Sequence, residues 1–476
     1  MTTMTASPAP PPAINREALG HAGVENAHNR AGGCTRPVRL VGHTAFVNTS
    51  TGEVDRVYAS AGELDGYTYA RCGNRRASVC PSCSREYKGD AWHLLLCGLA
   101  GGKGIPETVS DHPCTFATLT APTFGLVHGI RDKGPCRARR DKPVCSHGRP
   151  AWCNRRHSEE DPQVGQPLCF ECYNYTGHVV WQWHVPELWR RFGIALQRDL
   201  AKRCGLSAAR FRKRCRIAYS KVAEFQARGA IHLHAPIRLD GADGPDGPPP
   251  EVPLTTADLQ DAIKTAAAHV QLNSAPVDGV VYRLRWGSQV DCRTITDTTD
   301  PDRPSTTLIH PRQIAGYLAK YLTKATEDFG FSSRVFSAKH AATLGASPHV
   351  IRLIETAEHL HEVGGEPYER LAANYDSLGY RGHPMTKSHR YSVTFGQIRR
   401  SRRIHRARPA GLDPDADIRE LVDADLDDDL PEGFERVGAW EFAGLGYLDL
   451  PTAAAAVESA IRTRVREQDR MTARWE

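Results

Sequence analysis

Two strand-like segments joined by a short turn constrain the fold of this 476-residue chain more than any other feature. The segments RIAYSKVAEFQ (216–226) and AIHLHAPIRLDG (230–241) flank the turn ARG. Apolar and β-branched residues on both sides of a glycine-containing turn predict an antiparallel β-hairpin. Because residues i and i+2 of a strand share a face, His232 and His234 should point to the same side of the sheet.

Two neighbouring imidazoles on one strand face predict a metal site. The partner segment carries Glu224 and Gln226, and either side chain could supply an oxygen ligand to the same ion. Two nitrogen ligands and one oxygen ligand leave coordination positions open, which suits Mg²⁺ or Mn²⁺ and a role in polarising a phosphate oxygen. The alternative is a pair of ordinary strand histidines that bind nothing.

The segment GYLAKYLTK lies in a predicted helix that begins after a proline. Residues i and i+4 share a helix face, so Tyr317 and Tyr321 should lie side by side, with Lys320 and Lys324 in a neighbouring row. A tyrosine hydroxyl can attack a phosphodiester, and the lysines can hold phosphates or stabilise the developing charge. The alternative is a helix that carries two half-buried aromatic residues.

The chain has 14 cysteines, and in a chain expected inside the cell this number indicates metal binding rather than disulfides. A CxxC pair with further cysteines nearby is typical of structural zinc sites. The first such group consists of Cys34, Cys72, Cys80 and Cys83. The second lies in a loop-rich insert at about 128–175 and contains Cys136, Cys145, Cys153, Cys169 and Cys172, with His147 and His157. Which residues complete the CFEC pair of this second group stays open.

The distribution of charge indicates a nucleic-acid binder. The formal net charge is only +6, but basic residues concentrate in 149–156, 190–216 and 381–408, whereas 413–435 is strongly acidic. The sequence predicts no membrane span and no signal peptide, so we expect a cytoplasmic protein without a membrane partner. The proline- and alanine-rich residues 1–30 are expected to be a disordered tail.

Three short motifs occur in the order found in HUH endonucleases that initiate rolling-circle replication: FATLT (116–120), HLH (232–234) and YLAKYLTK (317–324). The longer segments CGNRRASVCPSC, KVAEFQARGAIHLHAPIRLDG and RYSVTFGQIR resemble those of RepSA-type initiators of actinobacterial plasmids and integrative conjugative elements. This resemblance extends from about residue 34 to 408. Gln226 stands where the related phage enzymes carry a further histidine. The third metal ligand could therefore be either Glu224 or Gln226.

The resemblance implies an α+β fold in which an antiparallel HUH-endonuclease sheet is flanked by helices, with zinc-binding modules and a mostly helical C-terminal region. We expect a cysteine-rich zinc module over 31–110 and the endonuclease domain, including its zinc-ribbon-like insert, over 111–330. A basic helical DNA-binding region should follow over 331–410. An acidic segment and a C-terminal helix should complete the chain over 411–476.

The implied activity is nicking and religation of origin DNA through a metal-assisted tyrosine transesterification. Implied partners are single- and double-stranded origin DNA and a host helicase and polymerase, and implied cofactors are a catalytic Mg²⁺ or Mn²⁺ and structural Zn²⁺. A conjugative relaxase or transposase would use the same chemistry, although relaxases usually place the tyrosine before the histidine motif. A non-enzymatic zinc-dependent DNA-binding regulator would need neither the histidines nor the tyrosines.

Overall fold

The computed structural model describes residues 31–472 except 64, 139–143, 297–306, 324–328, 330, 332–333, 408–418, 420–432 and 449. The expected tail over 1–30, Lys324 and most of the acidic segment therefore lie outside the described residues. The chain divides into two compact units. One comprises Met1–Gly89, Arg399–Leu412 and Ile418–Glu476, and the other comprises Asp90–Ile398 and Asp413–Asp417.

The first unit is built on an antiparallel sheet with strand order β12-β1-β2, to which a short β3 adds by pairing with β1. Its strands are β1 (Val38–Asn48), β2 (Val54–Ala59), β3 (Thr68–Ala70) and β12 (Phe434–Leu445). The sequence predicts only an acidic segment and a helix beyond residue 411, so β12 is an additional element. It pairs with β1 along its whole length, from Val38 opposite Leu445 to Asn48 opposite Phe434. The expected C-terminal helix is α11 (Leu450–Thr472).

The second unit contains a six-stranded sheet with strand order β10-β9-β4-β6-β5-β11. All neighbouring strands are antiparallel except β10 and β9, which confirms the expected α+β class. The predicted hairpin is formed by the two longest strands near the centre of this sheet. The strands are β4 (Cys114–Leu119), β5 (Arg216–Phe225), β6 (Ile231–Asp240), β9 (Val290–Ile295), β10 (Leu308–Ile309) and β11 (Met385–Lys387).

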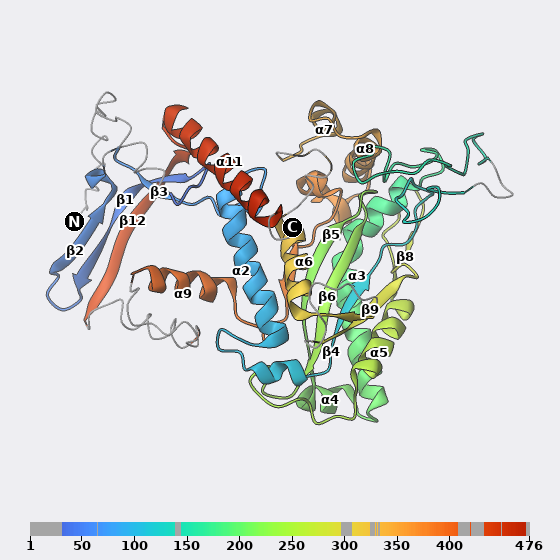
Figure 1. Ribbon diagram of the computed structural model, residues 1–476, viewed down its shortest axis with the longest axis horizontal. Coiled ribbons are helices and arrows are strands. Elements are labelled where there is room, and N and C mark those ends of the chain that lie inside the picture. Colours follow the sequence, from blue (N-terminus) through green and yellow to red (C-terminus); the bar gives the residue numbers. More distant parts are fainter. Residues whose placement is uncertain are drawn as a thin grey trace. The chain divides into compact units, whose positions relative to one another are not determined.

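Two helices, α3 (Tyr175–Arg203) and α5 (Thr256–His269), cover one face of this sheet and bury its main hydrophobic core. The odd-numbered residues of β6 supply the strand side of that core, among them Leu233, Ala235 and Ile237. A further helix, α6 (Pro311–Thr323), lies along the opposite side of the sheet (Figure 1). The sheet faces therefore have different roles, since the histidines occupy the even-numbered positions and point away from the main core.

The amphipathic pattern of α6 explains why its tyrosines are available for chemistry. Its buried residues recur at helical spacing and pack on the sheet: Ile314, Ala315, Leu318, Ala319 and Leu322. Pro311 opens the helix, where its missing N–H costs no hydrogen bond. Tyr317 is 37% exposed, on the flank of this apolar stripe.

A buried ion pair lies within β6, and its arginine also links this strand to the helix α2 (Pro81–Ala100), whose second half belongs to this unit. The Arg238 guanidinium is fully buried and donates to both carboxylate oxygens of Asp240, at 2.5 and 2.9 Å. It also donates to the carbonyls of Gly98 and Tyr391. Burial raises the pKa of Asp240, but hydrogen bonds from Arg238 and His112 outweigh it and hold that pKa below its ordinary value.

Among the remaining elements, α8 (Pro348–Val363) also contributes buried residues to the main core, and most of the others are short. In agreement with the expected helical character of the C-terminal region, the described residues between 331 and 407 form mainly helices and 3₁₀ turns. These other elements are η1 (Ser60–Gly62), η2 (Glu107–Asp111), α4 (Ala208–Arg214), β7 (Gln271–Asn273), β8 (Arg283–Arg285), α7 (Ala338–Thr343), α8, η4 (Glu366–Tyr368), η5 (Leu371–Ser377) and α9 (Phe395–Ala407). Across the described residues, none of the helices combines the length and apolar character needed to span a bilayer.

Candidate active site and metal clusters

His234 lies at the centre of a cluster of side chains on the α6 side of the sheet. Its Nε2 atom is 2.5 Å from Oε2 of Glu224, and its Nδ1 atom is 3.0 Å from the hydroxyl of Thr118 on β4. The ring of Phe116 stacks against the imidazole at 5.9 Å. Contacts on both nitrogens and on one ring face hold the imidazole in one orientation, with Nε2 directed at Glu224.

The strand register brings His232 to the same cluster. His232 is directly opposite Glu224 in the β5–β6 ladder, and its ring centre is 6.1 Å from that of His234. Burial, with the nearby charges of His234 and Arg228, lowers the pKa of His232 to about 4. His232 is therefore neutral at pH 7 and keeps a nitrogen lone pair, as a metal ligand must.

The two candidates for the oxygen ligand occupy different surroundings. Glu224 faces the histidines. Burial alone would raise its pKa, but contacts with His234, Tyr317 and Tyr321 outweigh this effect and hold the pKa below its ordinary value. Gln226 lies just beyond the end of β5, and its side-chain oxygen accepts a hydrogen bond from Arg228 at 3.0 Å. Of the two, only Glu224 is in contact with a histidine.

Both tyrosines of α6 reach this cluster. The Tyr317 hydroxyl donates to Oε2 of Glu224 at 2.8 Å and lies 3.5 Å from Nε2 of His234. The ring centres of Tyr317 and Tyr321 are 4.7 Å apart, as expected for i and i+4 neighbours. Burial, and secondarily the charge of Glu224, raises the pKa of the Tyr317 hydroxyl well above its ordinary value.

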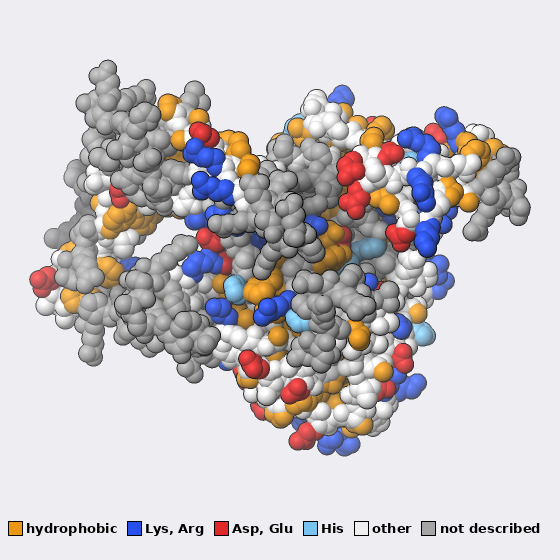
Figure 2. Space-filling model, in the orientation of Figure 1, with side chains coloured by type: hydrophobic (Ala, Val, Ile, Leu, Met, Phe, Trp, Pro, Cys, Tyr) orange, Lys and Arg blue, Asp and Glu red, His pale blue; other side chains and the backbone are white. Residues whose placement is uncertain are grey.

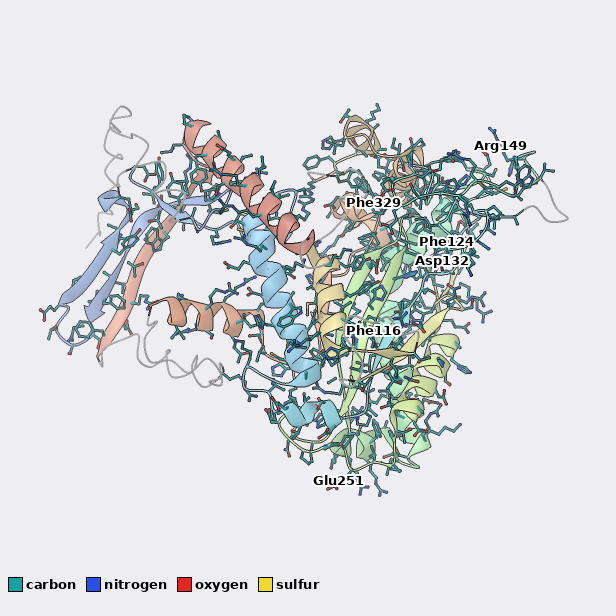
Figure 3. All side chains as sticks on the ribbon, viewed as in Figure 1. Phe116, Phe124, Asp132, Arg149, Glu251 and Phe329 are labelled. Carbon is teal, nitrogen blue, oxygen red and sulfur yellow. The ribbon has the colours of Figure 1, made fainter. Side chains whose placement is uncertain are left out.

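Of the two lysines predicted beside the tyrosines, Lys320 is described and is exposed. Its Nζ atom lies 5.9 Å from the centre of the Tyr321 ring, so the cation sits next to the tyrosine pair. Phe116 meets Tyr317 edge-on at 6.3 Å and closes the other side of the cluster. Figure 3 shows Phe116 on the sheet behind α6.

The first cysteine group forms one tight cluster, named cluster A: Cys34, Cys72, Cys80 and Cys83. The Cys72 and Cys83 sulfurs are 3.7 Å apart, and those of Cys34 and Cys80 are 3.8 Å apart. Four tetrahedral sulfur ligands at about 2.3 Å from a zinc ion would be separated by about 3.8 Å. The expected ligand set thus has the geometry of a structural zinc site.

The structure divides the second group into two clusters. Cluster B consists of His128, Cys136, Cys153 and His157, and cluster C consists of Cys145, His147, Cys169 and Cys172. The CFEC pair is thus completed by Cys145 and His147, whereas Cys136 and Cys153 belong to a separate site. In each cluster the ligand atoms all lie within 4.8 Å of one another, so each could hold a metal ion such as zinc.

Cluster B includes a candidate ligand, His128, that the sequence did not reveal. Nδ1 of His128 is 3.2 Å from Nε2 of His157, which is 3.4 Å from the Cys153 sulfur. The other nitrogen of His157 is 2.7 Å from a carboxylate oxygen of Asp161, an arrangement typical of metal-binding histidines. The CxxxH spacing of Cys153 and His157 was visible in the sequence, but His128 lies outside any such motif. All 14 cysteines are described, and none of them forms a disulfide.

Comparison with known proteins identifies the family to which this chain belongs. The family model RepSA, described as "Replication initiator protein, pSAM2", matches residues 21–461. The chain belongs to the RepSA family of replication initiators. It is 39% identical over 456 residues to the "Replication initiator protein" of Streptomyces ambofaciens, with 94% of this chain and 91% of that protein covered. No solved structure matches the chain.

Proposed function

We propose that this RepSA-family chain nicks and rejoins origin DNA by tyrosine transesterification during rolling-circle replication. The observation that carries the proposal is the hydrogen bond from the Tyr317 hydroxyl to Glu224, which itself contacts His234. A potential nucleophile and a set of candidate metal-ligand side chains thus meet on the side of the sheet that α6 covers. This combination is what a metal-assisted phosphodiester cleavage requires.

His232, His234 and Glu224 would hold a divalent ion, because their nitrogen and oxygen donors suit Mg²⁺ or Mn²⁺ and one sheet face carries all three. When bound, such an ion would polarise a non-bridging oxygen of the scissile phosphate. Thr118 would keep Nδ1 of His234 engaged, so that Nε2 stays directed at the ion. Gln226, which is held by Arg228, is not part of this proposed set.

In the proposed reaction the Tyr317 oxygen attacks the phosphorus, and Glu224 orients its hydroxyl and can accept its proton. A tyrosine–phosphorus ester bond forms while the bond from phosphorus to the 3′ oxygen breaks, and the departing 3′ oxygen takes a proton from solvent. The products are a 5′-phosphotyrosine and a free 3′-OH that a host polymerase extends, with a helicase opening the duplex. Tyr321 could cut the regenerated origin, and Lys320 would stabilise the charge on the phosphate.

Replacement of either histidine by alanine should lower nicking of single-stranded origin DNA by about 100-fold or more, since metal assistance contributes several kcal/mol. Gel analysis of end-labelled oligonucleotides measures this effect. The wild-type chain should require added Mn²⁺ or Mg²⁺ for nicking. His269→Ala is the matched control, because His269 is exposed on α5, on the opposite side of the sheet. Wild-type rates in both His232→Ala and His234→Ala would refute the proposed metal site.

We also propose that clusters A, B and C each bind one structural zinc. The purified chain should then contain three zinc ions, and His128→Ala or Cys153→Ser should each reduce the count to two. Elemental analysis after dialysis measures the number directly. Cys204→Ser should keep all three ions, because Cys204 belongs to none of the clusters. A His128→Ala chain that retains the wild-type zinc content would contradict the assignment of cluster B.

The insert and the basic C-terminal region would contact duplex origin DNA. Lys and Arg side chains gather on the insert, at the upper right of Figure 2. The exposed ones among the described residues are Arg131, Lys133, Arg149, Arg155 and Arg156. Helix α9 adds a further basic segment, RRSRR, from residue 399 to 403. Such contacts supply affinity for phosphates rather than sequence recognition.

A further inference from the structure

A cavity of about 540 Å³ opens next to the candidate active site. The clustered catalytic-site side chains do not line it. Its wall includes Thr120 and Gln226, which follow Thr118 and Glu224 by two residues, or about 7 Å of extended chain. The cavity therefore begins where the strands that carry the site end, and its volume is in the range of small-ligand pockets.

Close backbone contacts build the walls of this cavity. Gly165 of the insert has a φ of +85°, and a Cβ atom there would lie 2.3 Å from the carbonyl oxygen of Ala227 at the hairpin tip. A Cβ atom on Gly287 would lie 2.6 Å from the carbonyl oxygen of Ala121. Only glycine permits such approaches, so the insert and the hairpin tip are held together around the cavity.

The lining is positively charged. Two arginines, Arg137 and Arg228, contribute to it, and none of the described residues that line it is acidic. The hydrogen-bond donors of Arg228 are already used within the protein, because its guanidinium donates to Gln226 and to the carbonyls of Ala121 and Pro122. It also lies 5.9 Å over the ring of Phe124. Arg228 thus forms part of the wall and gives it a positive charge.

Arg137 is the residue with donors to offer. Its buried Nε atom has no hydrogen-bond partner among the described residues. Its backbone is fixed by a two-way pair with Cys153, with N···O distances of 2.9 and 2.8 Å, and it follows Cys136 directly. Two ligands of cluster B therefore hold Arg137 at the cavity wall, and the planar guanidinium fork suits a phosphate.

We propose that the cavity binds a nucleotide of single-stranded origin DNA adjacent to the scissile phosphate, with Arg137 contacting its backbone phosphate. The proposal rests on the proposed nicking function, which places the scissile phosphate at Tyr317. It assigns cluster B a positioning role, because the ligands of this cluster fix the arginine. A single strand fits such a site, since its backbone can bend off the sheet edge into a cavity.

The test is the affinity of the full-length, zinc-loaded chain for a labelled single-stranded origin oligonucleotide, measured by fluorescence anisotropy without added Mg²⁺ or Mn²⁺. Arg137→Ala should weaken binding by about ten-fold or more. It should also make the dependence of log K on log salt shallower by about 0.7, the contribution of one phosphate contact on a single strand. A duplex of the same sequence should show neither change.

Lys264→Ala is the matched control. It also removes one positive charge from the same unit, but Lys264 is exposed on α5, which covers the opposite face of the sheet from the candidate active site. Its single-strand affinity and salt slope should equal those of the wild type. Because Arg137→Ala could release zinc, Ser288→Glu provides a second variant: Ser288 is exposed on the cavity lining, and a negative charge there should also weaken binding.

The proposal is overturned if Arg137→Ala and Ser288→Glu both bind the single strand as tightly as Lys264→Ala does. An equal loss on duplex DNA would also overturn it, since that result indicates a general electrostatic contact. Nicking with added Mn²⁺ is measured separately on the same proteins. If the wild-type chain nicks while Arg137→Ala and Ser288→Glu both bind the single strand normally, the cavity proposal alone is refuted. A wild-type chain that never nicks, with affinity lost in Arg137→Ala, refutes the nicking chemistry and leaves the cavity as a single-strand site.

Discussion

A chain carrying both Tyr317→Phe and Tyr321→Phe should form no covalent adduct with origin DNA. The double substitution removes both hydroxyls that the structure places at Glu224, while the rings that pack beside α6 remain. Each single variant should keep some nicking, because the two rings are 4.7 Å apart and either oxygen could reach the same phosphate. Denaturing gels that separate protein–DNA adducts from free DNA measure the outcome.

The single variants decide between two nucleophiles and one. Tyr282→Phe serves as a control, because Tyr282 is a tyrosine of the same unit that lies outside the cluster. If Tyr317→Phe loses all adduct while Tyr321→Phe behaves as the wild type, Tyr317 is the sole nucleophile and Tyr321 only packs against it. An adduct formed by the double variant would contradict the participation of both residues.

Asp240→Ala should destabilise the second unit by about 3–5 kcal/mol, because it leaves the fully buried guanidinium of Arg238 without its counter-charge. The pKa of Asp240 is held below its ordinary value, so this stabilisation is fully present at neutral pH. It is lost only as the pH falls below the ordinary range of aspartate. Urea unfolding followed by tryptophan fluorescence measures the difference.

Asp199→Ala is the control for this loss of stability. Asp199 also pairs with an arginine, Arg203, at 2.6 Å, but it does so along one helix and with partial exposure to solvent. Its replacement should change the free energy of unfolding by no more than about 0.5 kcal/mol. Similar destabilisation by Asp240→Ala and Asp199→Ala would show that the buried pair has no special role.

The parts of the fold that follow local periodicity were predictable from the sequence. The hairpin of β5 and β6 alternates on either side of a glycine turn, and α6 repeats its apolar residues at helical spacing. These patterns specify which face each side chain takes, so His232, His234 and Tyr317 could be placed on common surfaces. Their meeting in one cluster required the packing of α6 on the sheet, for which the family resemblance supplied the expectation.

The features that were missed depend on contacts between distant segments. β12 forms its ladder with β1, almost four hundred residues earlier in the chain, and such pairing has no local pattern. His128 joins Cys136, Cys153 and His157 through loops without periodicity. Whether Glu224 or Gln226 contacts a histidine depends on where β5 ends, at Phe225, and on the hydrogen bond that Arg228 donates to Gln226. Sequence spacing alone determines none of these.

The most direct test of the proposed chemistry is to identify the residue that becomes linked to DNA. The wild-type chain is incubated with Mn²⁺ and single-stranded DNA from its element's origin. The product is then digested with protease and nuclease, and the DNA-linked peptide is sequenced by mass spectrometry. A 5′-phosphotyrosine bond to Tyr317 or Tyr321, together with a free 3′-OH on the other fragment, is the predicted result. Cleavage without any covalent adduct, or an adduct on a residue outside α6, would contradict tyrosine transesterification at this site.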